Sequence, residues 1–276
     1  MSTVKLSVGE TIWYRKLGAG APLLHIHGSA FGYRNFEKLT PLMTDHFEVI
    51  DFDLPGYGES RGDPRPSGMN GLAEQVFEFI RVAGYRRVHI HGTSFGAMIG
   101  LTLAANHPEV VDCLVLSCFM ARYDNAARMM RATWKRAAVD SGMEAVADLT
   151  SVAGFARGFY DRQHSDAQLA SMREAFSRNT PEAFVAGTEI VEKTDLSSLV
   201  SKITSPVLLI AGDEDNMTPF VPAGSGVGMS RIQKMLPNCE ASVLEKCGHY
   251  LVIEQPENAA RLIKDFLDRS GSGKIA

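Results

Sequence analysis

Cysteine is scarce in this sequence, which has four cysteines and no CxxC pair, so neither a disulfide framework nor a zinc-type site is indicated. Cys113 and Cys118 lie in an apolar run typical of a buried strand, and all four are expected to be reduced thiols. No set of His, Cys and carboxylate residues has the spacing of metal ligands, and no dinucleotide-binding fingerprint is present. The sequence therefore predicts a protein without a metal or a cofactor.

Clustered basic residues and long apolar runs are also missing. The formal net charge of −4 provides no basic field that would attract nucleic acid. No apolar run approaches the roughly 18 residues that a membrane span needs, and residues 1–10 lack the pattern of a secretory signal. We therefore expect a cytoplasmic protein that acts on a small molecule and binds neither nucleic acid nor membrane. The sequence does not indicate an oligomeric state.

What is present is an alternation of short apolar runs with helical stretches. Such runs are typical of parallel strands buried on both faces, and the alternation indicates βαβ units in a doubly wound α/β sheet. A hairpin at residues 3–7 and 11–17 precedes them and predicts an antiparallel edge. The expected strands are 22–26, 47–52, 88–90, 111–118, 206–211 and 242–244, and the expected helices are 36–43, 72–82, 97–106 and 256–268.

The alternation stops between residues 120 and 198. This stretch is rich in Ala, Arg, Met and Asp and shows no buried strand, so it predicts a helical insertion. We expect residues 1–119 and 199–276 to form one core domain that the insertion covers. Most aromatic and methionine side chains of the insertion are expected to pack against one another, and only some to face a ligand.

A candidate nucleophile lies between an expected strand and an expected helix. Residues 92–96 read GTSFG, and a G-x-S-x-G motif in this context favours a strained turn that exposes the Ser94 hydroxyl. The helix N-terminus that follows favours developing negative charge. The alternative, a plain glycine-rich turn, is less consistent with the strand and helix on either side.

A serine hydroxyl needs a base, and the base needs a carboxylate to orient it. Of the eight histidines, His249 fits best, because it follows the strand 242–244 and precedes the last helix. After the strand 206–211, three acids are available for the second role, namely Asp213, Glu214 and Asp215. The residues themselves leave the choice among these three acids open.

The order of these motifs resembles that of the α/β-hydrolase superfamily. Residues 212–219, with Gly212, Asp215 and Pro219, look like its acid loop, which selects Asp215. Residues 27–28 (HG), 53–60 (DLPGYGES) and 254–257 (EQPE) are similar to further motifs of the superfamily. The resemblance implies a mostly parallel eight-stranded sheet with a helical cap at 120–198, and a triad of Ser94, Asp215 and His249.

The resemblance also implies an oxyanion hole made by the backbone N–H groups of Ser29 and Phe95. It predicts hydrolysis of a carboxylic ester or lactone of a small, partly apolar substrate through an acyl-enzyme. Asp51 and Asp53 are interpreted as scaffold residues. The expected substrate contacts are His27, Phe119, Tyr123, Trp134 and Tyr250.

Other activities remain open within the same fold. Hydrolysis of a carbon–carbon bond in a diketone is second to ester hydrolysis, because residues 27–32 (HGSAFG) lack a longer glycine run and Tyr250 stands where such enzymes often have Trp. A cofactor-free dioxygenase, a ligand receptor and an inactive scaffold are further alternatives. The complete set of three catalytic residue types favours hydrolysis.

Overall fold

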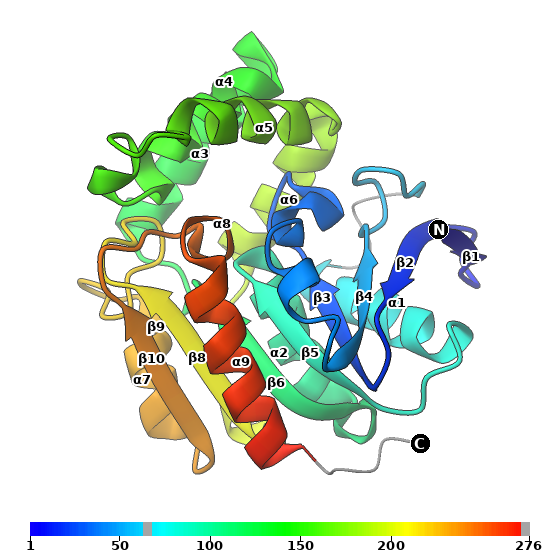
Figure 1. The fold of residues 1–276 in the computed structure, drawn as a ribbon. Coiled ribbons are helices and arrows are strands. Elements are labelled where there is room, and N and C mark those ends of the chain that lie inside the picture. The colour runs from blue at the N-terminus through cyan, green and yellow to red at the C-terminus, as the bar shows by residue number, and fades with distance from the viewer. Residues whose placement is uncertain (63–67, 272–276) are drawn as a thin grey trace.

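The computed structural model describes residues 1–62 and 68–271, and these form an eight-stranded sheet flanked by helices on both faces (Figure 1). The strand order is β1-β2-β4-β3-β5-β6-β8-β10, with antiparallel pairing at β1–β2 and β2–β4 and parallel pairing elsewhere. The strands are β1 (Ser2–Lys5), β2 (Thr11–Leu17), β3 (Ala21–Ile26), β4 (Phe47–Phe52), β5 (Val88–Thr93), β6 (Val111–Ser117), β8 (Val207–Gly212) and β10 (Cys239–Leu244). The doubly wound α/β fold expected from the sequence is confirmed.

Side chains alternate along the central strands and form one apolar core on each face of the sheet. On one face, Leu24 and Ile90 pack with α1 (Gly68–Val82), α2 (Phe95–Asn106) and α7 (Met229–Met235). On the other face, Leu23 and Val115 pack with α9 (Pro256–Ser270), which runs across the front of the sheet (Figure 1). The near-continuous apolar runs of the sequence therefore reflect strands that are covered on both sides.

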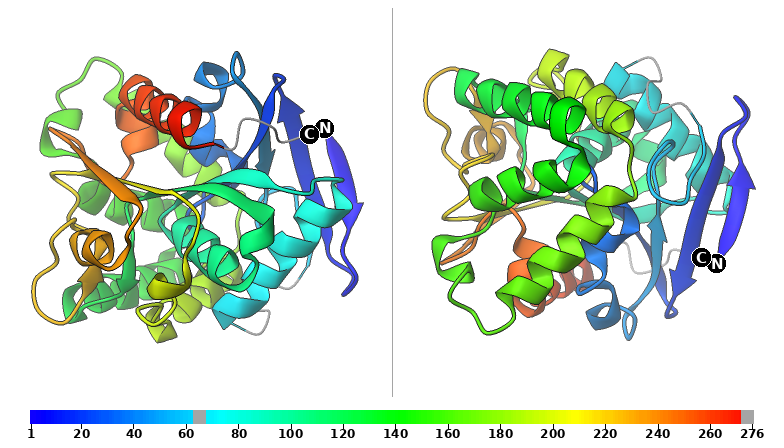
Figure 2. Two further views of the ribbon diagram at one scale, coloured as in Figure 1. Left: turned by 90° about the horizontal axis from the view of Figure 1, so that it is seen from below. Right: turned by 90° about the horizontal axis from the view of Figure 1, so that it is seen from above.

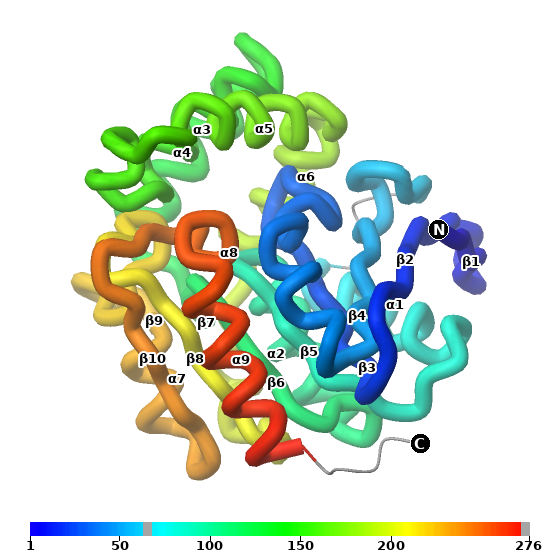
Figure 3. The backbone as a smooth tube through the Cα atoms, in the orientation of Figure 1, coloured from blue at the N-terminus to red at the C-terminus, as the bar shows by residue number. Residues whose placement is uncertain are grey.

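Four helices between β6 and β8 form a separate layer. They lie over the carboxyl edge of the sheet, as the tube and the view from above show (Figures 2 and 3). Asn179 ties this layer to the core, because its Nδ2 donates to the Ala30 carbonyl at 2.6 Å and its Oδ1 accepts from the Gly58 N–H at 3.1 Å. The four helices are α3 (Asn125–Ser141), α4 (Met143–Gly154), α5 (Ser165–Ser177) and α6 (Pro181–Lys193).

Local sequence explains how two of these helices begin. The Asp124 carboxylate accepts the Ala127 N–H at 2.9 Å and caps α3, and the Thr180 hydroxyl accepts the Ala183 N–H at 3.1 Å and caps α6. Pro181 at the first turn of α6 has no N–H to leave unsatisfied. Among the described residues, no helix is both long and apolar enough to cross a bilayer.

Two expectations about secondary structure were wrong. Residues 36–43 are not one helix but parts of two 3₁₀ helices, η1 (Gly32–Phe36) and η2 (Thr40–Leu42), because Pro41 lacks the N–H that a continuous helix would use. Residues 120–198 contain a short buried strand, β7 (Met120–Arg122), which pairs with β9 (Val227–Gly228). Three residues are too few to show a strand periodicity. The remaining short elements are η3 (Pro108–Val110), η4 (Arg157–Phe159), η5 (Val200–Lys202) and α8 (Leu251–Glu254).

The topology brings four loops together at one edge of the sheet. Strands β3, β5, β8 and β10 end at Ile26, Thr93, Gly212 and Leu244, and each is followed by a sequence motif singled out above. The carboxyl ends of parallel strands share one edge, and this is where ligands bind in open α/β sheets.

Candidate active site

Ser94 occupies a strained turn between β5 and α2. Its φ of 55° and ψ of −112° are rare for a residue with a side chain. The Ser94 N–H donates to the Ser117 carbonyl at 2.8 Å, and its own carbonyl accepts from the Ala97 N–H at 3.0 Å. Because the backbone is held on both sides, the side chain is presented to the pocket in a fixed position.

The two glycines of the motif are required by close packing of the backbone. A Cβ atom added to Gly96 would lie 2.0 Å from the Ile26 carbonyl oxygen, and one added to Gly92 would lie 2.4 Å from the Gly96 carbonyl oxygen. Both distances are far below van der Waals contact, and backbone atoms cannot move aside cheaply. The glycines therefore allow α2 to start directly against β3 and β5.

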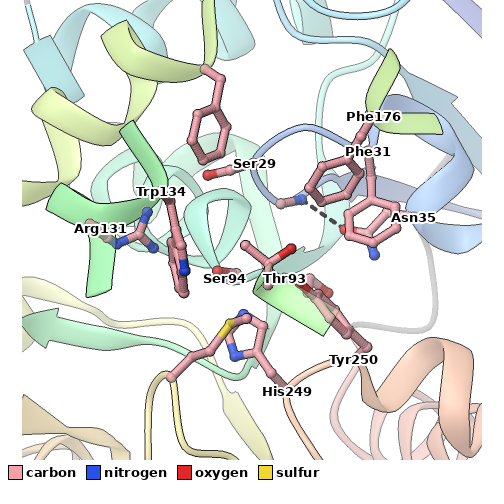
Figure 4. Close-up of a pocket in the computed structure, with 14 residues that line it drawn as sticks. Ser29, Phe31, Asn35, Thr93, Ser94, Arg131, Trp134, Phe176, His249 and Tyr250 are labelled. Atoms are coloured by element: carbon pink, nitrogen blue, oxygen red, sulfur yellow. Dashed lines mark hydrogen bonds between the residues drawn. The ribbon is translucent and has the colours of Figure 1, made fainter. Parts of the chain in front are cut away.

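His249 and Asp215 are paired. The Nδ1 atom of His249 lies 2.9 Å from Oδ2 of Asp215, and the Thr218 hydroxyl lies 3.1 Å from the same nitrogen. His249 lines the same pocket as Ser94, and Figure 4 shows the imidazole beside the serine. With Nδ1 directed at the carboxylate, Nε2 is the ring nitrogen that remains for a proton from a reacting group.

Asp215 is buried, and its carboxylate is surrounded by donors. Burial alone would raise its pKa, but the charge and hydrogen bond of His249 and the donors from Thr218 outweigh it, so the pKa lies below the usual value. Oδ1 accepts the N–H groups of Met217 and Thr218, each at 2.9 Å, and Oδ2 accepts the Thr218 hydroxyl at 2.8 Å. Asp215 therefore stays ionised next to the imidazole.

The two neighbouring acids have other partners. Asp213 is exposed and accepts the Cys247 N–H at 3.1 Å, and Glu214 accepts the Arg157 N–H at 2.7 Å. Of the three acids that the sequence left open, only Asp215 contacts His249 within the described part of the chain.

The two predicted oxyanion donors come from the loop after β3 and from the turn after β5. Phe95 is the first residue of α2, where an N–H has no partner within the helix. Ser29 lines the pocket and belongs to the loop after β3. The Asn35 side chain fixes this loop by accepting the Gly28 N–H at 2.8 Å (Figure 4). Within the described residues, neither the Phe95 nor the Ser29 N–H donates a hydrogen bond to another residue.

His27 is placed behind the pocket and does not line it. Its Nε2 accepts the Leu54 N–H at 2.9 Å and its Nδ1 lies 2.7 Å from the Gly28 carbonyl, so the ring is neutral with the proton on Nδ1. Burial lowers its pKa to about 4, which keeps it neutral at physiological pH. The structure therefore gives His27 the position of a loop anchor and not of a substrate contact.

The pocket is lined by apolar and aromatic side chains together with polar ones. Of the expected substrate contacts, Trp134 and Tyr250 line it (Figure 4). Phe119 and Tyr123 do not, because Phe119 is fully buried in the core and the Tyr123 hydroxyl accepts a hydrogen bond from Arg131. The other lining residues are Gly28, Phe31, Thr93, Arg131, Thr150, Phe176, Phe184 and Met217, together with Ser29, Asn35, Ser94 and His249.

Most of these lining residues were not found from the sequence. Phe176 comes from α5, Phe184 from α6 and Thr150 from α4, so their proximity depends on how separate helices pack. One signal was available for Arg131, because it precedes Trp134 by three residues and therefore lies on the same helix face.

Glu254 holds the loop that carries His249. Its Oε1 accepts the Gly248 N–H at 2.9 Å, and its Oε2 accepts the Ala156 N–H at 3.2 Å from the segment after α4. Burial raises its pKa to about 7 despite these two donors. Asp53 is similar, since burial raises its pKa to about 6 while it accepts the Tyr33 and Glu59 N–H groups, in agreement with a scaffold role.

Within residues 1–62 and 68–271, two groups of possible metal ligands lie close together in space although their members are not spaced as ligands in the sequence. His89, Asp112 and Cys113 form one, and Cys118 joins Asp215 and His249 in the other. Spacing along the chain could not show them, because they come from different strands and loops. Burial raises the pKa of Cys113 to about 12 and that of Cys118 well above its usual range. Both therefore remain neutral thiols, which are poor metal ligands.

Sequence comparisons extend over most of the chain. A pimeloyl-[acyl-carrier protein] methyl ester esterase of Nitrosomonas europaea is 30% identical over 257 residues, covering 87% of this chain and 93% of that protein. A 2-hydroxy-6-oxononadienedioate/2-hydroxy-6-oxononatrienedioate hydrolase of Pseudomonas putida is 27% identical over 277 residues, covering 92% and 90%.

Proteins of known structure share the fold of this chain. The enol-lactonase of Burkholderia xenovorans LB400 superposes with a TM-score of 0.87 at 21% identity, covering 97% of this chain and all of that one (100%). A sequence model described as the alpha/beta hydrolase family matches residues 23–262. The chain therefore belongs to the alpha/beta hydrolase family.

Proposed function

We propose that the protein is a serine hydrolase that cleaves a carboxylic ester or lactone of a small, partly apolar substrate. The observation that carries this proposal is the Asp215–His249 pair, 2.9 Å apart, in one pocket with Ser94 on its strained turn. Nucleophilic acyl transfer requires a nucleophile, a base and a carboxylate that orients the base, and these three residues would supply them. The similarity to a methyl ester esterase and to an enol-lactonase supports the same reaction class.

In the proposed mechanism, Ser94 Oγ attacks the substrate carbonyl carbon while His249 Nε2 accepts the hydroxyl proton. The Asp215 carboxylate stabilises the imidazolium that forms. The carbonyl oxygen becomes an oxyanion and accepts hydrogen bonds from the Phe95 and Ser29 N–H groups. His249 then gives its proton to the departing alkoxide, which leaves an ester between the acyl group and Ser94. Water, deprotonated by His249, hydrolyses this ester and restores the enzyme.

The insertion, residues 120–198, is proposed to act as a cap domain. It contributes Trp134, Phe176 and Phe184 to the pocket, opposite the residues that come from the sheet edge. A largely apolar cap over the site excludes bulk water, which strengthens hydrogen bonds to the oxyanion.

Hydrolysis of a carbon–carbon bond in a diketone-type metabolite is a second candidate. The relative from Pseudomonas putida is, by its name, a hydrolase of 2-hydroxy-6-oxononadienedioate and 2-hydroxy-6-oxononatrienedioate. Such a compound has no ester bond, so its hydrolysis would break a carbon–carbon bond next to a ketone. The same Ser94 and His249 would serve this reaction, with a carbanion instead of an alkoxide as the leaving group.

The test is turnover of three substrate panels by the wild type and by Ser94→Ala. The panels are p-nitrophenyl esters of increasing acyl length, simple lactones, and 2-hydroxy-6-oxo dienoic acids. We expect ester or lactone turnover that is lost in Ser94→Ala and kept in Ser198→Ala, a matched control at an exposed serine. Turnover of the dienoic acids alone would replace the first candidate by the second. Turnover that survives in Ser94→Ala would contradict both.

A further inference from the structure

Arg131 is a buried cation that faces the candidate active site. It lies on α3, is 5% exposed and lines the pocket with Ser94 and His249 (Figure 4). Its Nη2 donates a hydrogen bond to the Tyr123 hydroxyl at 2.6 Å. The guanidinium carbon lies 4.7 Å from the centre of the Tyr123 ring and 5.7 Å from that of Trp134. These contacts hold the guanidinium in place and leave donors directed at the pocket, since an arginine has five.

Within the described residues, no carboxylate forms an ion pair with Arg131. Two partly buried arginines do have a carboxylate partner, since Arg15 pairs with Asp51 at 2.8 Å and Arg34 pairs with Glu174 at 3.0 Å. A buried charge without a counter-ion is costly, and rings and a neutral hydroxyl compensate only part of the lost hydration. Such an arrangement is expected where a ligand supplies the missing anion.

The rest of the pocket lining supports an anionic ligand. Among the described residues that line the pocket, Arg131 and His249 are the only ones with a basic side chain, and none is an aspartate or a glutamate. The hydroxyls of Ser29 and Thr93 are buried without hydrogen-bond partners and also line the pocket. They offer further donors to the oxygen atoms of a bound substrate.

We propose that the substrate carries a carboxylate that pairs with Arg131 while its scissile carbonyl group is at Ser94. This inference rests on the proposed function, because it assigns the two ends of one substrate to two places in the same pocket. A planar carboxylate matches the guanidinium fork. A phosphate dianion, with a second negative charge, would need more than the single arginine that lines the pocket.

The test compares esters that differ only in this charge. Monomethyl esters of succinate, glutarate, adipate and pimelate are each compared with the methyl ester of the corresponding monoamide, which has the same shape and no charge. The measured quantity is the ratio of kcat/KM for acid over amide at each chain length. Because charge-assisted hydrogen bonds are worth about 1.5–3 kcal/mol, we expect a ratio of roughly 10–150 at the best length.

Variants of Arg131 test whether this residue causes the preference for the acid over the amide. Arg131→Met, similar in length and uncharged, should bring the ratio close to one, and Arg131→Lys should keep part of it. Arg128→Met is the matched control, because Arg128 lies one turn earlier on α3 and is exposed. The melting temperature of Arg131→Met should not fall, since the variant removes a buried charge that has no counter-ion. A ratio near one in the wild type, or an equal ratio in Arg131→Met, would overturn the inference.

A binding experiment separates this inference from the proposed function. The free dicarboxylates, succinate to pimelate, are titrated calorimetrically into Ser94→Ala and into Ser94→Ala with Arg131→Met. Arg131-dependent binding would support the carboxylate site even if no ester were hydrolysed. Ser94-dependent hydrolysis of the amide esters with no Arg131-dependent binding would leave the proposed function standing and contradict the inference.

Discussion

Glu254 accepts a hydrogen bond from the Gly248 N–H at 2.9 Å, directly before His249 in the chain. Burial raises the Glu254 pKa from 4.5 to about 7 in the folded protein. Between these two values the folded state binds more protons than the unfolded state. The contribution of Glu254 to the free energy of unfolding therefore falls as the pH rises through this window.

The Glu254→Gln variant should lose this contribution. The free energy of unfolding of the wild type minus that of the variant should decrease by about 1–3 kcal/mol between pH 5 and pH 8. Urea unfolding at both pH values measures it. Glu257→Gln, at an exposed position near the start of α9, should show no such change. Equal pH dependence in the wild type and Glu254→Gln would show that Glu254 ionises normally.

Asp215→Asn should keep the fold and lose most of the activity. An amide cannot stabilise the imidazolium and favours the wrong imidazole tautomer, so kcat should fall roughly 10³–10⁴-fold. Asp213→Asn is the matched control, because Asp213 is exposed and its contact is to the Cys247 N–H, which an amide oxygen also accepts. Kinetics on the best substrate of the panels measure both. Similar losses in the two variants would contradict the assignment of Asp215.

Gly96→Ala should destabilise the fold strongly. Its Cβ would lie 2.0 Å from the Ile26 carbonyl oxygen, so β3 and α2 would have to separate. We expect a loss of about 3 kcal/mol or more in the free energy of unfolding. Gly158→Ala, where the added Cβ would have no atom within 4 Å, should change it by less than about 0.5 kcal/mol. A Gly96→Ala protein as stable as the wild type would show that the turn is looser than described.

Substitutions of Trp134 and Phe119 should distinguish a residue that lines the pocket from one that lies only in the core. Phe119→Ala empties a fully buried site and should cost about 3–5 kcal/mol of stability, with an unchanged profile of acyl-chain preference. Trp134→Ala enlarges the pocket and should shift that preference toward longer chains. Thermal unfolding and kcat/KM across the p-nitrophenyl ester series measure the two effects. A shifted profile in Phe119→Ala would place this side chain against the substrate after all.

The features that could be predicted from the sequence are those set by local signals in a known order. Ser94 lies directly between a strand and a helix, and His249 follows the last strand. Each residue could therefore be placed at the edge of the sheet from the sequence alone. The choice of Asp215 over Asp213 came from the resemblance, and the contact with His249 agrees with it. Because the strands are parallel, residues that follow different strands lie at the same edge of the sheet.

The features that could not be predicted depend on packing between distant segments. Arg131, Thr150 and Phe176 meet because α3, α4 and α5 pack over the edge of the sheet, and no spacing along the chain encodes this arrangement. His27 was expected in the pocket because of its motif, yet its ring turns toward the Leu54 N–H. A motif fixes where a residue is in the chain but not which way its side chain points.

Covalent labelling of Ser94 tests the central claim most directly. The purified protein is treated with a fluorophosphonate probe, and the modified peptide is identified by mass spectrometry. We predict one adduct per chain, on Ser94, and none on Ser94→Ala, with labelling slowed strongly in Asp215→Asn because the nucleophile depends on the His249–Asp215 pair. An adduct on another residue, or equal labelling of Ser94→Ala, would contradict the assignment of Ser94 as the nucleophile.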